Sequence, residues 1–390
     1  MKFDPPRRAV FIAGFAAFID LYAPQSVLSS LSTEFQVTPA DAGGIVGIST
    51  LAIAIAAPFA GLIADKFGQR RTMLTAIFLL VPVTALLAAV HGLNEMLALR
   101  FVQGLLLPAI FSSAVAFTAE YWSPAEAVDV TGLYVLGSIL GGFSGRFLTA
   151  IAAEHFGWRG GFLALTAITA LFAAGLWAWL PAHTRRGPSA RPPGLGAFLD
   201  HLRNPPLLAT CGVGAAVLFG NVATFTYIDF RLERPPFNLS PTALGMIFTV
   251  YLLGAVATPL SGAFIRRAGR RGALAIAASI GILGIAGTVF DWLPTVILGL
   301  ALFVTSVFLA QTASLGFIGQ VARHNKTSAV GLYVCSYYVG GSLGAVLPGS
   351  IWDSAGWPGC VALVVATTIL ATLLAMWAWR ERKIVIAATE

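Results

Sequence analysis

Charged residues are scarce in this chain of 390 residues. Only 11% of its residues are Asp, Glu, Lys or Arg, against about 25% in an average soluble domain. Hydrophobic residues make up 57%, and the mean hydropathy is +0.82. A chain with so few charges cannot cover a water-exposed surface of this size. The composition therefore excludes an ordinary soluble protein and predicts an integral membrane protein.

Several kinds of functional group are missing as well. The sequence has no G-x-x-x-x-G-K-[ST] motif, so direct use of ATP is not expected. The five histidines fall in loops or at the ends of apolar runs, which leaves no material for a buried metal cluster or a histidine-based catalytic triad. Three cysteines give no disulfide framework, and no filter-like loop suggests a channel. We expect no enzyme, no cofactor and no metal.

What the sequence does have is long apolar runs. About 20 apolar residues are needed to cross a bilayer as a helix. Twelve such runs are present, which predicts an all-α protein with twelve membrane-spanning helices. They cover residues 8–30, 41–64, 72–90, 95–119, 127–153, 159–180, 205–230, 241–265, 272–290, 294–318, 327–352 and 356–379.

The basic residues of the connecting segments predict the orientation. With both termini on the same side, nineteen Lys and Arg lie on that side and only three, Arg159, Arg231 and Arg234, lie on the other. Lys and Arg concentrate in cytoplasmic loops, so we expect cytoplasmic termini in a bacterial inner membrane. The net charge of +7 then reflects topology, and no nucleic acid partner is expected. The first run contains Asp20 and lacks a clear cleavage site, which indicates a retained helix.

The chain repeats itself after about 200 residues. GLYVLGSILGGFSG at 132–145 returns as GLYVCSYYVGGSLG at 331–344, and PFAGLIADKFGQRR at 58–71 returns as PLSGAFIRRAGRRG at 259–272. Duplicated sets of spanning helices are typical of secondary transporters, whose substrate site lies between the halves. The expected organisation is a six-helix bundle at 1–180, a cytoplasmic linker rich in Pro, Gly and Arg at 181–204, and a second six-helix bundle at 205–390.

The loop after the second run carries a specific pattern. Glycines, an aspartate and basic residues are spaced along it, and this spacing resembles the loop between helices two and three of the major facilitator superfamily. The resemblance implies that the cluster latches the cytoplasmic gate when the transporter opens outward. The residues concerned are Gly61, Asp65, Lys66, Gly68, Arg70 and Arg71.

Three further elements are similar to the drug or sugar efflux proton antiporters of that superfamily. The fourth run contains R-x-x-Q-G, with Arg100 and Gln103, and the first run has an acid, Asp20, four residues before Pro24. The fifth run contains G-S-x-x-G-G, where Ser138 replaces the proline usual in antiporters. The resemblance implies proton exchange by rocking of the two halves, and the serine departs from it.

Few ionisable residues fall deep in the runs, namely Asp20, Arg100, Arg146 and, near a run's end, Asp229. A charge at the centre of a spanning helix costs about 3 kcal/mol on insertion scales, so each needs a partner or a wet cavity. Asp20 and Arg100 are predicted to form a buried pair that a proton or a substrate breaks; a static structural pair is the alternative. Arg146 could line the cavity or extend towards the membrane surface.

The repeat places an uncharged residue opposite each of these charges. Asp20 falls opposite Asn221, Arg100 near Ala301 and Arg146 opposite Ala345. Proton coupling is therefore assigned to Asp20 and Arg100, while the second half would offer polar and aromatic contacts to a substrate. Packing is the alternative role for each of these. The predicted substrate cavity consists of Tyr22, Gln25, Gln103, Arg146, Asn221, Tyr227, Tyr251, Gln311, Tyr337 and Tyr338.

Together these patterns predict a monomeric secondary transporter with the major facilitator fold. We expect proton-coupled efflux of small organic solutes, in contact with membrane lipid. Two arginines against one carboxylate favour neutral or anionic solutes over lipophilic cations. A proton-coupled uptake symporter uses the same charges in the opposite direction and stays open as an alternative. A membrane sensor with this fold, which binds a solute without moving it, is the alternative from another class.

Overall fold

The computed structural model describes residues 4–182, 200–322 and 324–379. Within these ranges, nine helical stretches are long and apolar enough to cross a membrane. The predicted linker at 181–204 falls largely outside the described residues.

Three of the nine stretches are each two spans. They are α6 (Pro124–Trp179), α10 with its preceding α9, and α12 (Lys326–Ala378). A straight helix of the 56 residues of α6 would be about 84 Å long, nearly three times the thickness of the bilayer core. Each stretch is broken at one glycine with positive φ. These glycines are Gly157 (φ 70°), Gly269 (φ 69°) and Gly356 (φ 57°). Three breaks in nine stretches make twelve spans, and the predicted fold class is confirmed.

The breaks lie where the sequence predicted short loops, at 153–159, 265–272 and 352–356. Positive φ strains any residue with a Cβ, so glycine is the residue that permits the chain to reverse there without a longer connection. Elsewhere the ends of helices carry conventional signals. Thr38 and Asp41 form a capping box at the start of α3 (Pro39–Phe67), and Gly68 (φ 87°) separates α3 from α4 (Gln69–Leu87).

The first spans of the two halves differ from each other. In the first half, the first span consists of α1 (Pro5–Tyr22), a 3-10 segment η1 (Ala23–Val27) and α2 (Leu28–Phe35). The other separate helix of that half, besides α3 and α4, is α5 (Leu93–Tyr121). In the second half, the first span α8 (Pro205–Leu232) is continuous, and the 3-10 segment falls in the next one. The remaining elements are α9 (Pro241–Ile247), η2 (Phe248–Leu252), α10 (Leu253–Gly287) and α11 (Leu293–Val321).

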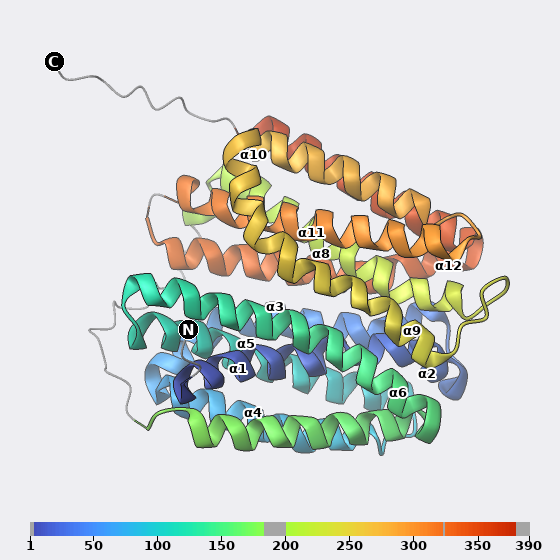
Figure 1. The fold of residues 1–390 in the computed structure, drawn as a ribbon, viewed down its shortest axis with the longest axis horizontal. Coiled ribbons are helices and arrows are strands. Elements are labelled where there is room, and N and C mark those ends of the chain that lie inside the picture. Colours follow the sequence, from blue (N-terminus) through green and yellow to red (C-terminus); the bar gives the residue numbers. More distant parts are fainter. Residues whose placement is uncertain (1–3, 183–199, 323, 380–390) are drawn as a thin grey trace.

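The helices form two bundles that lie one above the other in Figure 1, with blue to green residues below and yellow to red residues above. Within the first bundle α1 packs on α6 and α3 on α5; within the second α8 packs on α12 and α10 on α11. The bundles meet where α3 contacts α12 and where α6 contacts α9 and η2. The interface between the halves is therefore made by a few elements, and it is the natural place for a site.

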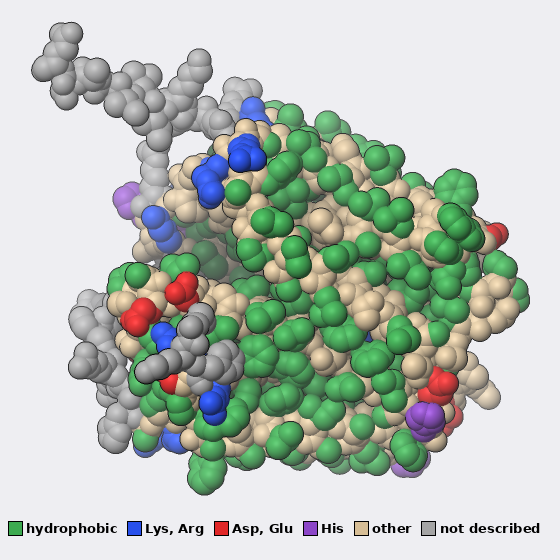
Figure 2. Space-filling model, viewed as in Figure 1, with side chains coloured by type: hydrophobic (Ala, Val, Ile, Leu, Met, Phe, Trp, Pro, Cys, Tyr) green, Lys and Arg blue, Asp and Glu red, His purple; other side chains and the backbone are tan. Residues whose placement is uncertain are grey.

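The surface separates apolar and charged side chains. Figure 2 shows hydrophobic side chains over the middle of the visible face and charged ones towards the two ends. The visible Lys and Arg gather at the end where the N-terminus lies, whereas Asp, Glu and His are seen at both ends. An apolar belt between charged ends is the arrangement that a bilayer requires. The chain is therefore a multi-pass membrane protein.

Candidate functional site

The first buried charge is held by a break in the first span. Pro24 has no backbone N–H, so the carbonyl of Asp20, four residues earlier, has no helical donor. Arg100 from α5 supplies one, because its Nη1 donates to the Asp20 carbonyl at 3.0 Å and its Nη2 donates to the carbonyl of Leu21. Its Nε donates to the carbonyl of Ile45 in α3 at 3.2 Å. Arg100, which is fully buried, thus joins its own helix to α1 and α3 through three buried backbone carbonyl groups.

The carboxylate of Asp20 has other partners. Its Oδ1 accepts from the hydroxyl of Thr84 in α4 at 2.8 Å, and its Oδ2 accepts from Thr169 in α6 at 2.9 Å. Gln103 connects the two groups, since its Nε2 donates to Thr84 Oγ1 at 2.7 Å while its Oε1 accepts from Arg100 at 2.6 Å. Asp20 and Arg100 therefore lie together, joined by a relay through Thr84 and Gln103.

This geometry differs from a direct ion pair. No salt bridge joins the Asp20 carboxylate to Arg100 within the described part of the chain. Four acceptors already occupy the guanidinium, and protonation of Asp20 would act on it through Gln103 and Thr84. The two threonines are the part of this site that sequence reasoning missed, because threonine is common in spanning helices and carries no signal of its own.

The second buried charge, Arg146 on α6, faces the interface between the halves. Its guanidinium carbon lies 4.7 Å from the ring centre of Tyr22, 5.0 Å from that of Phe248 and 4.5 Å from that of Tyr251. Such cation–π contacts are strong when the groups are desolvated, and Arg146 is only 1% exposed. Two of the three rings belong to the second half. The alternative that Arg146 extends to the membrane surface is therefore wrong.

Hydrogen bonds continue this contact across the interface. Arg146 Nε donates to Gln25 Oε1 at 2.8 Å, and Gln25 Nε2 donates to Thr226 Oγ1 at 3.1 Å. Gln25 and Thr226 are 201 positions apart, the offset of the early repeat, so this bond joins equivalent positions of the two halves. Tyr251 donates to Asn221 Oδ1 at 3.0 Å. The cluster of Tyr22, Gln25, Arg146, Asn221, Phe248 and Tyr251 is called the Arg146 cluster below.

Two more predicted residues lie at the interface. Tyr338 of α12 stacks on Phe111 of α5 with ring centres 6.4 Å apart, and Tyr337 meets Tyr338 edge-on at 5.5 Å. These rings bring a helix of each half together beside the two sites. Gln311 is half-buried on α11 and makes no hydrogen bond to a described residue. Its place in the substrate cavity stays a prediction.

At the end of the molecule away from the N-terminus, the halves are in close contact. Gly43 and Gly47 of α3 lie against Ala345 of α12, so near that a Cβ on Gly43 would overlap the Ala345 carbonyl. Tyr227, predicted for the substrate cavity, donates to this same carbonyl at 2.8 Å. Glu154 of α6 accepts from the backbone N–H of Thr242 at 2.8 Å, at the start of α9. We call this region, which is seen on the right in Figure 1, the closed end.

The opposite end, at the left in Figure 1, lacks such packing. A Cβ on Gly61 of α3 or on Gly132 of α6 would meet nothing within 4 Å. Asp65, Lys66 and Arg71 are exposed, and Arg70 donates to the Leu180 carbonyl of its own half at 3.1 Å. Figure 2 shows the surface hollowed between the two bundles at this end. Among the described residues, no hydrogen bond or salt bridge therefore joins the predicted latch to the second half.

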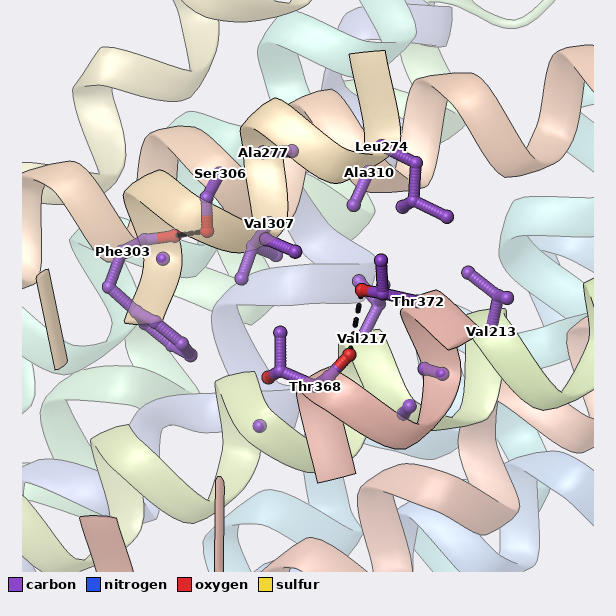
Figure 3. A pocket seen from close by; sticks show the side chains of 15 residues that line it. Val213, Val217, Leu274, Ala277, Phe303, Ser306, Val307, Ala310, Thr368 and Thr372 are labelled. Carbon is purple, nitrogen blue, oxygen red and sulfur yellow. Dashed lines mark hydrogen bonds between the residues drawn. The ribbon is translucent and has the colours of Figure 1, made fainter. Parts of the chain in front are cut away.

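A cavity of about 40 Å³ lies inside the second bundle, away from the interface. Figure 3 shows its lining, mostly apolar side chains of α8, α10, α11 and α12. The hydroxyls nearby, on Ser306 and Thr372, are bonded to backbone carbonyls of their own helices. None of the predicted site residues lines it. The cavity offers neither a charge nor a free polar group to a ligand.

Comparison with known proteins supports the membrane-transport interpretation of this geometry. The model of the Major Facilitator Superfamily matches residues 10–234 and 229–388. The chain is 31% identical over 368 residues to the inner membrane transport protein YnfM of Escherichia coli (strain K12), covering 94% of this chain and 88% of that protein.

Solved structures share the fold at low sequence identity. The nucleoside transporter NupG superposes with a TM-score of 0.78 at 13% identity, covering 97% of this chain and 100% of that chain. A bacterial homologue of the human lysosomal transporter Spinster, in an inward-facing and unoccupied conformation, gives a TM-score of 0.77 at 15% identity, covering 96% of this chain and 94% of that one.

Proposed function

Because the chain belongs to the major facilitator superfamily and is a membrane transporter rather than an enzyme, we propose that it exports small organic solutes in exchange for protons. The membrane is the bacterial inner membrane. The excess of Lys and Arg at the end where α1 begins supports a cytoplasmic position for that end. In this orientation the closed end faces outward, and the molecule is open to the cytoplasm.

Asp20 carries the proposal. It is fully buried inside the first half, lies two residues from Tyr22 of the Arg146 cluster, and reaches Arg100 through a continuous relay of hydrogen bonds. A proton on Asp20 converts one carboxylate oxygen from an acceptor into a donor, so Thr84 and Gln103 must reorient. That change reaches the carbonyl groups at the Pro24 break, where Arg100 holds α1, α3 and α5 together. Proton binding can thereby alter the packing of the first half.

The Arg146 cluster is the substrate-binding region in this proposal. It combines aromatic faces with a few polar groups, Gln25, Asn221 and the guanidinium, which is the usual make-up of a small-molecule site. Its groups come from both halves, so the affinity for a solute bound there depends on how the two halves are placed relative to each other. Tyr337, Tyr338, Gln103, Tyr227 and Gln311 complete the proposed set of substrate and gating contacts.

The latch acts in the outward-open state, in which the cytoplasmic end is closed. It consists of Gly61, Asp65, Lys66, Gly68, Arg70 and Arg71. Asp65 is exposed at the open end, and Gly61 leaves space beside α3. When the cytoplasmic end closes, that space can receive a helix of the second half, and Asp65 can face the positive N-terminal end of that helix. The latch then stabilises the outward-open state.

Proteoliposomes loaded with a pH-sensitive dye test this function. Purified protein is reconstituted, and a panel of sugars, organic acids and drugs is placed inside the vesicles. Antiport predicts acidification of the interior as a solute leaves, whereas symport predicts alkalinisation. Solute binding with no counterflow would support the sensor instead.

The Asp20→Asn variant sharpens the same experiment. It should abolish solute-driven proton movement, because the asparagine amide cannot take up a proton as the carboxylate does, while solute counterflow persists. Asp291→Asn is the matched control because Asp291 is exposed, paired with Arg231, and outside the relay. Full proton-driven transport in Asp20→Asn would overturn the assignment.

A further inference from the structure

Asp229 is a second buried carboxyl group, and it lies in the second half. It is on α8, only 2% exposed, two residues from Tyr227 at the closed end. Neither of its carboxylate oxygens accepts a hydrogen bond from any described residue. Asp20, by contrast, has a hydroxyl donor on each oxygen. An ionised carboxylate buried without donors is among the most costly groups in a protein.

The charges around Asp229 do not offset that cost. Arg146, from the other half, interacts with it electrostatically, yet no salt bridge within 4.0 Å joins them in the described chain. Buried charges repay their desolvation only with close geometry and further hydrogen bonds. The guanidinium is instead surrounded by the rings of Tyr22, Phe248 and Tyr251, and its Nη2 has no partner among the described residues.

Other ionisable groups near Asp229 add negative charge. Glu233, one turn further along α8, interacts unfavourably with it. Asp41 of α3 and Asp353 of α12 act on neighbouring Tyr227. Glu34 of α2 is paired with Arg159. Arg231, two residues further along α8, pairs with Asp291 instead, so Arg146 is the one described cation that acts on Asp229.

We propose that Asp229 is a second proton-binding residue, which holds a proton while the closed end is closed and releases it when that end opens to water. The inference rests on the proposed proton-coupled transport and adds a site to it. A proton on Asp229 removes the cost of burying the charge, so proton binding favours closure. In the orientation proposed above, this proton comes from the outside and returns there when the end reopens, so Asp229 makes closure depend on the external pH, while the proton that crosses the membrane is carried by Asp20.

The distance between the halves at the closed end reports this linkage without any solute. Spin labels are attached to Thr33→Cys and Ser354→Cys, two exposed positions on opposite halves near this end, in the full chain in lipid nanodiscs. Cys211, Cys335 and Cys360 are replaced by alanine in this background. We expect the open population to grow with pH, by up to about tenfold per pH unit for one linked proton.

The Asp229→Asn variant keeps the shape of the side chain and cannot ionise. We expect it to stay closed across the pH range, with the dependence on pH lost. Asp291→Asn, at an exposed residue paired with Arg231, and Glu233→Gln should retain the dependence of the unmodified chain. A wild-type dependence in Asp229→Asn, a loss of dependence in Glu233→Gln or Asp291→Asn instead, or a wild type that does not respond to pH would each overturn the inference.

Failure of this inference and failure of the proposed function give different results. Distances are measured without solute, whereas the function is judged from solute-driven proton movement and its loss in Asp20→Asn. If Asp20→Asn abolishes proton movement in vesicles but Asp229→Asn keeps the pH-dependent opening, the export proposal stands and the second proton site is rejected. Loss of pH-dependent opening in Asp229→Asn with no proton movement in vesicles would do the reverse.

Discussion

In the first half, Gly14 packs on Tyr134 and Gly141 lies against the carbonyl of Phe15; in the second half, Gly214 packs on Tyr333 and Gly340 lies against the carbonyl of Ala215. The pairs are related by about 200 positions, so the same contact between two helices is built twice. Small residues let the backbones approach closely, which is the main source of helix association in a membrane. The duplication therefore preserved the packing inside each bundle.

The contacts between the halves were not preserved in the same way. Arg146 of the first half contacts Phe248 of the second half. In the repeat, Arg146 corresponds to Ala345 and Phe248 corresponds to Gly47, and these two residues also contact each other. The contact at Arg146 is made by a guanidinium and aromatic rings, whereas the contact between Gly47 and Ala345 is made by small residues. The first contains groups that a solute can compete for; the side chains of the second pair carry no polar group, and the hydrogen bond beside them comes from Tyr227. Equivalent positions can thus carry polar side chains on one side and only close packing on the other.

The shared packing predicts the largest effect. Gly141→Val and Gly340→Val should each prevent folding, because the added Cβ overlaps a backbone carbonyl that cannot move aside. Overpacking of this kind costs about 3 kcal/mol or more when the backbone is involved. Size-exclusion profiles of the detergent-solubilised protein give the readout. Gly132→Val is the control, since nothing lies within 4 Å of its Cβ, and equal damage there would contradict the packing argument.

Replacing the buried charge of Arg100 in the first half should have a smaller effect on stability. Arg100→Gln leaves the carbonyls of Asp20, Leu21 and Ile45 without their donor. We expect a loss of about 2 to 3 kcal/mol, as for a buried charged hydrogen-bonding group. Thermal unfolding in nanodiscs measures it, with the exposed Arg71→Gln as control. A stability equal to that of the control would mean that water satisfies these carbonyls and that Arg100 serves coupling alone.

The closed end predicts the smallest effect. Tyr227→Phe removes one hydrogen bond, from the tyrosine hydroxyl to the Ala345 carbonyl, worth about 1 kcal/mol. Because the same hydroxyl also lies against Gly43 of α3, across the interface, part of this energy depends on closure, and its loss should raise the open population in the spin-label experiment by at most about fivefold. The exposed Tyr121→Phe should change nothing. A shift of the same size in both variants would place the effect outside the closed end.

Much of the fold followed from local properties of the chain. The twelve runs and the short connections at Gly157, Gly269 and Gly356 were predictable, because a spanning helix satisfies its own backbone and needs only length and hydropathy. The nearness of Asp20 to Arg100 was also predictable from depth in the membrane. Their indirect connection was not, because Thr84 and Thr169 become partners only through the rotation of α4 and α6 about their axes.

The amino-acid sequence was enough to predict a membrane protein with two related six-helix halves and with its buried charges unequally divided between them. Only the packed structure shows that Arg146 faces the other half, that Tyr227 lies at the closed end, and that Asp229 has no hydrogen-bond donor among the described residues. The reason is physical: hydrogen bonds within a helix join residues four positions apart, whereas these contacts join residues of different helices. Which groups meet there depends on how the helices pack against one another, and neither hydropathy nor spacing encodes that.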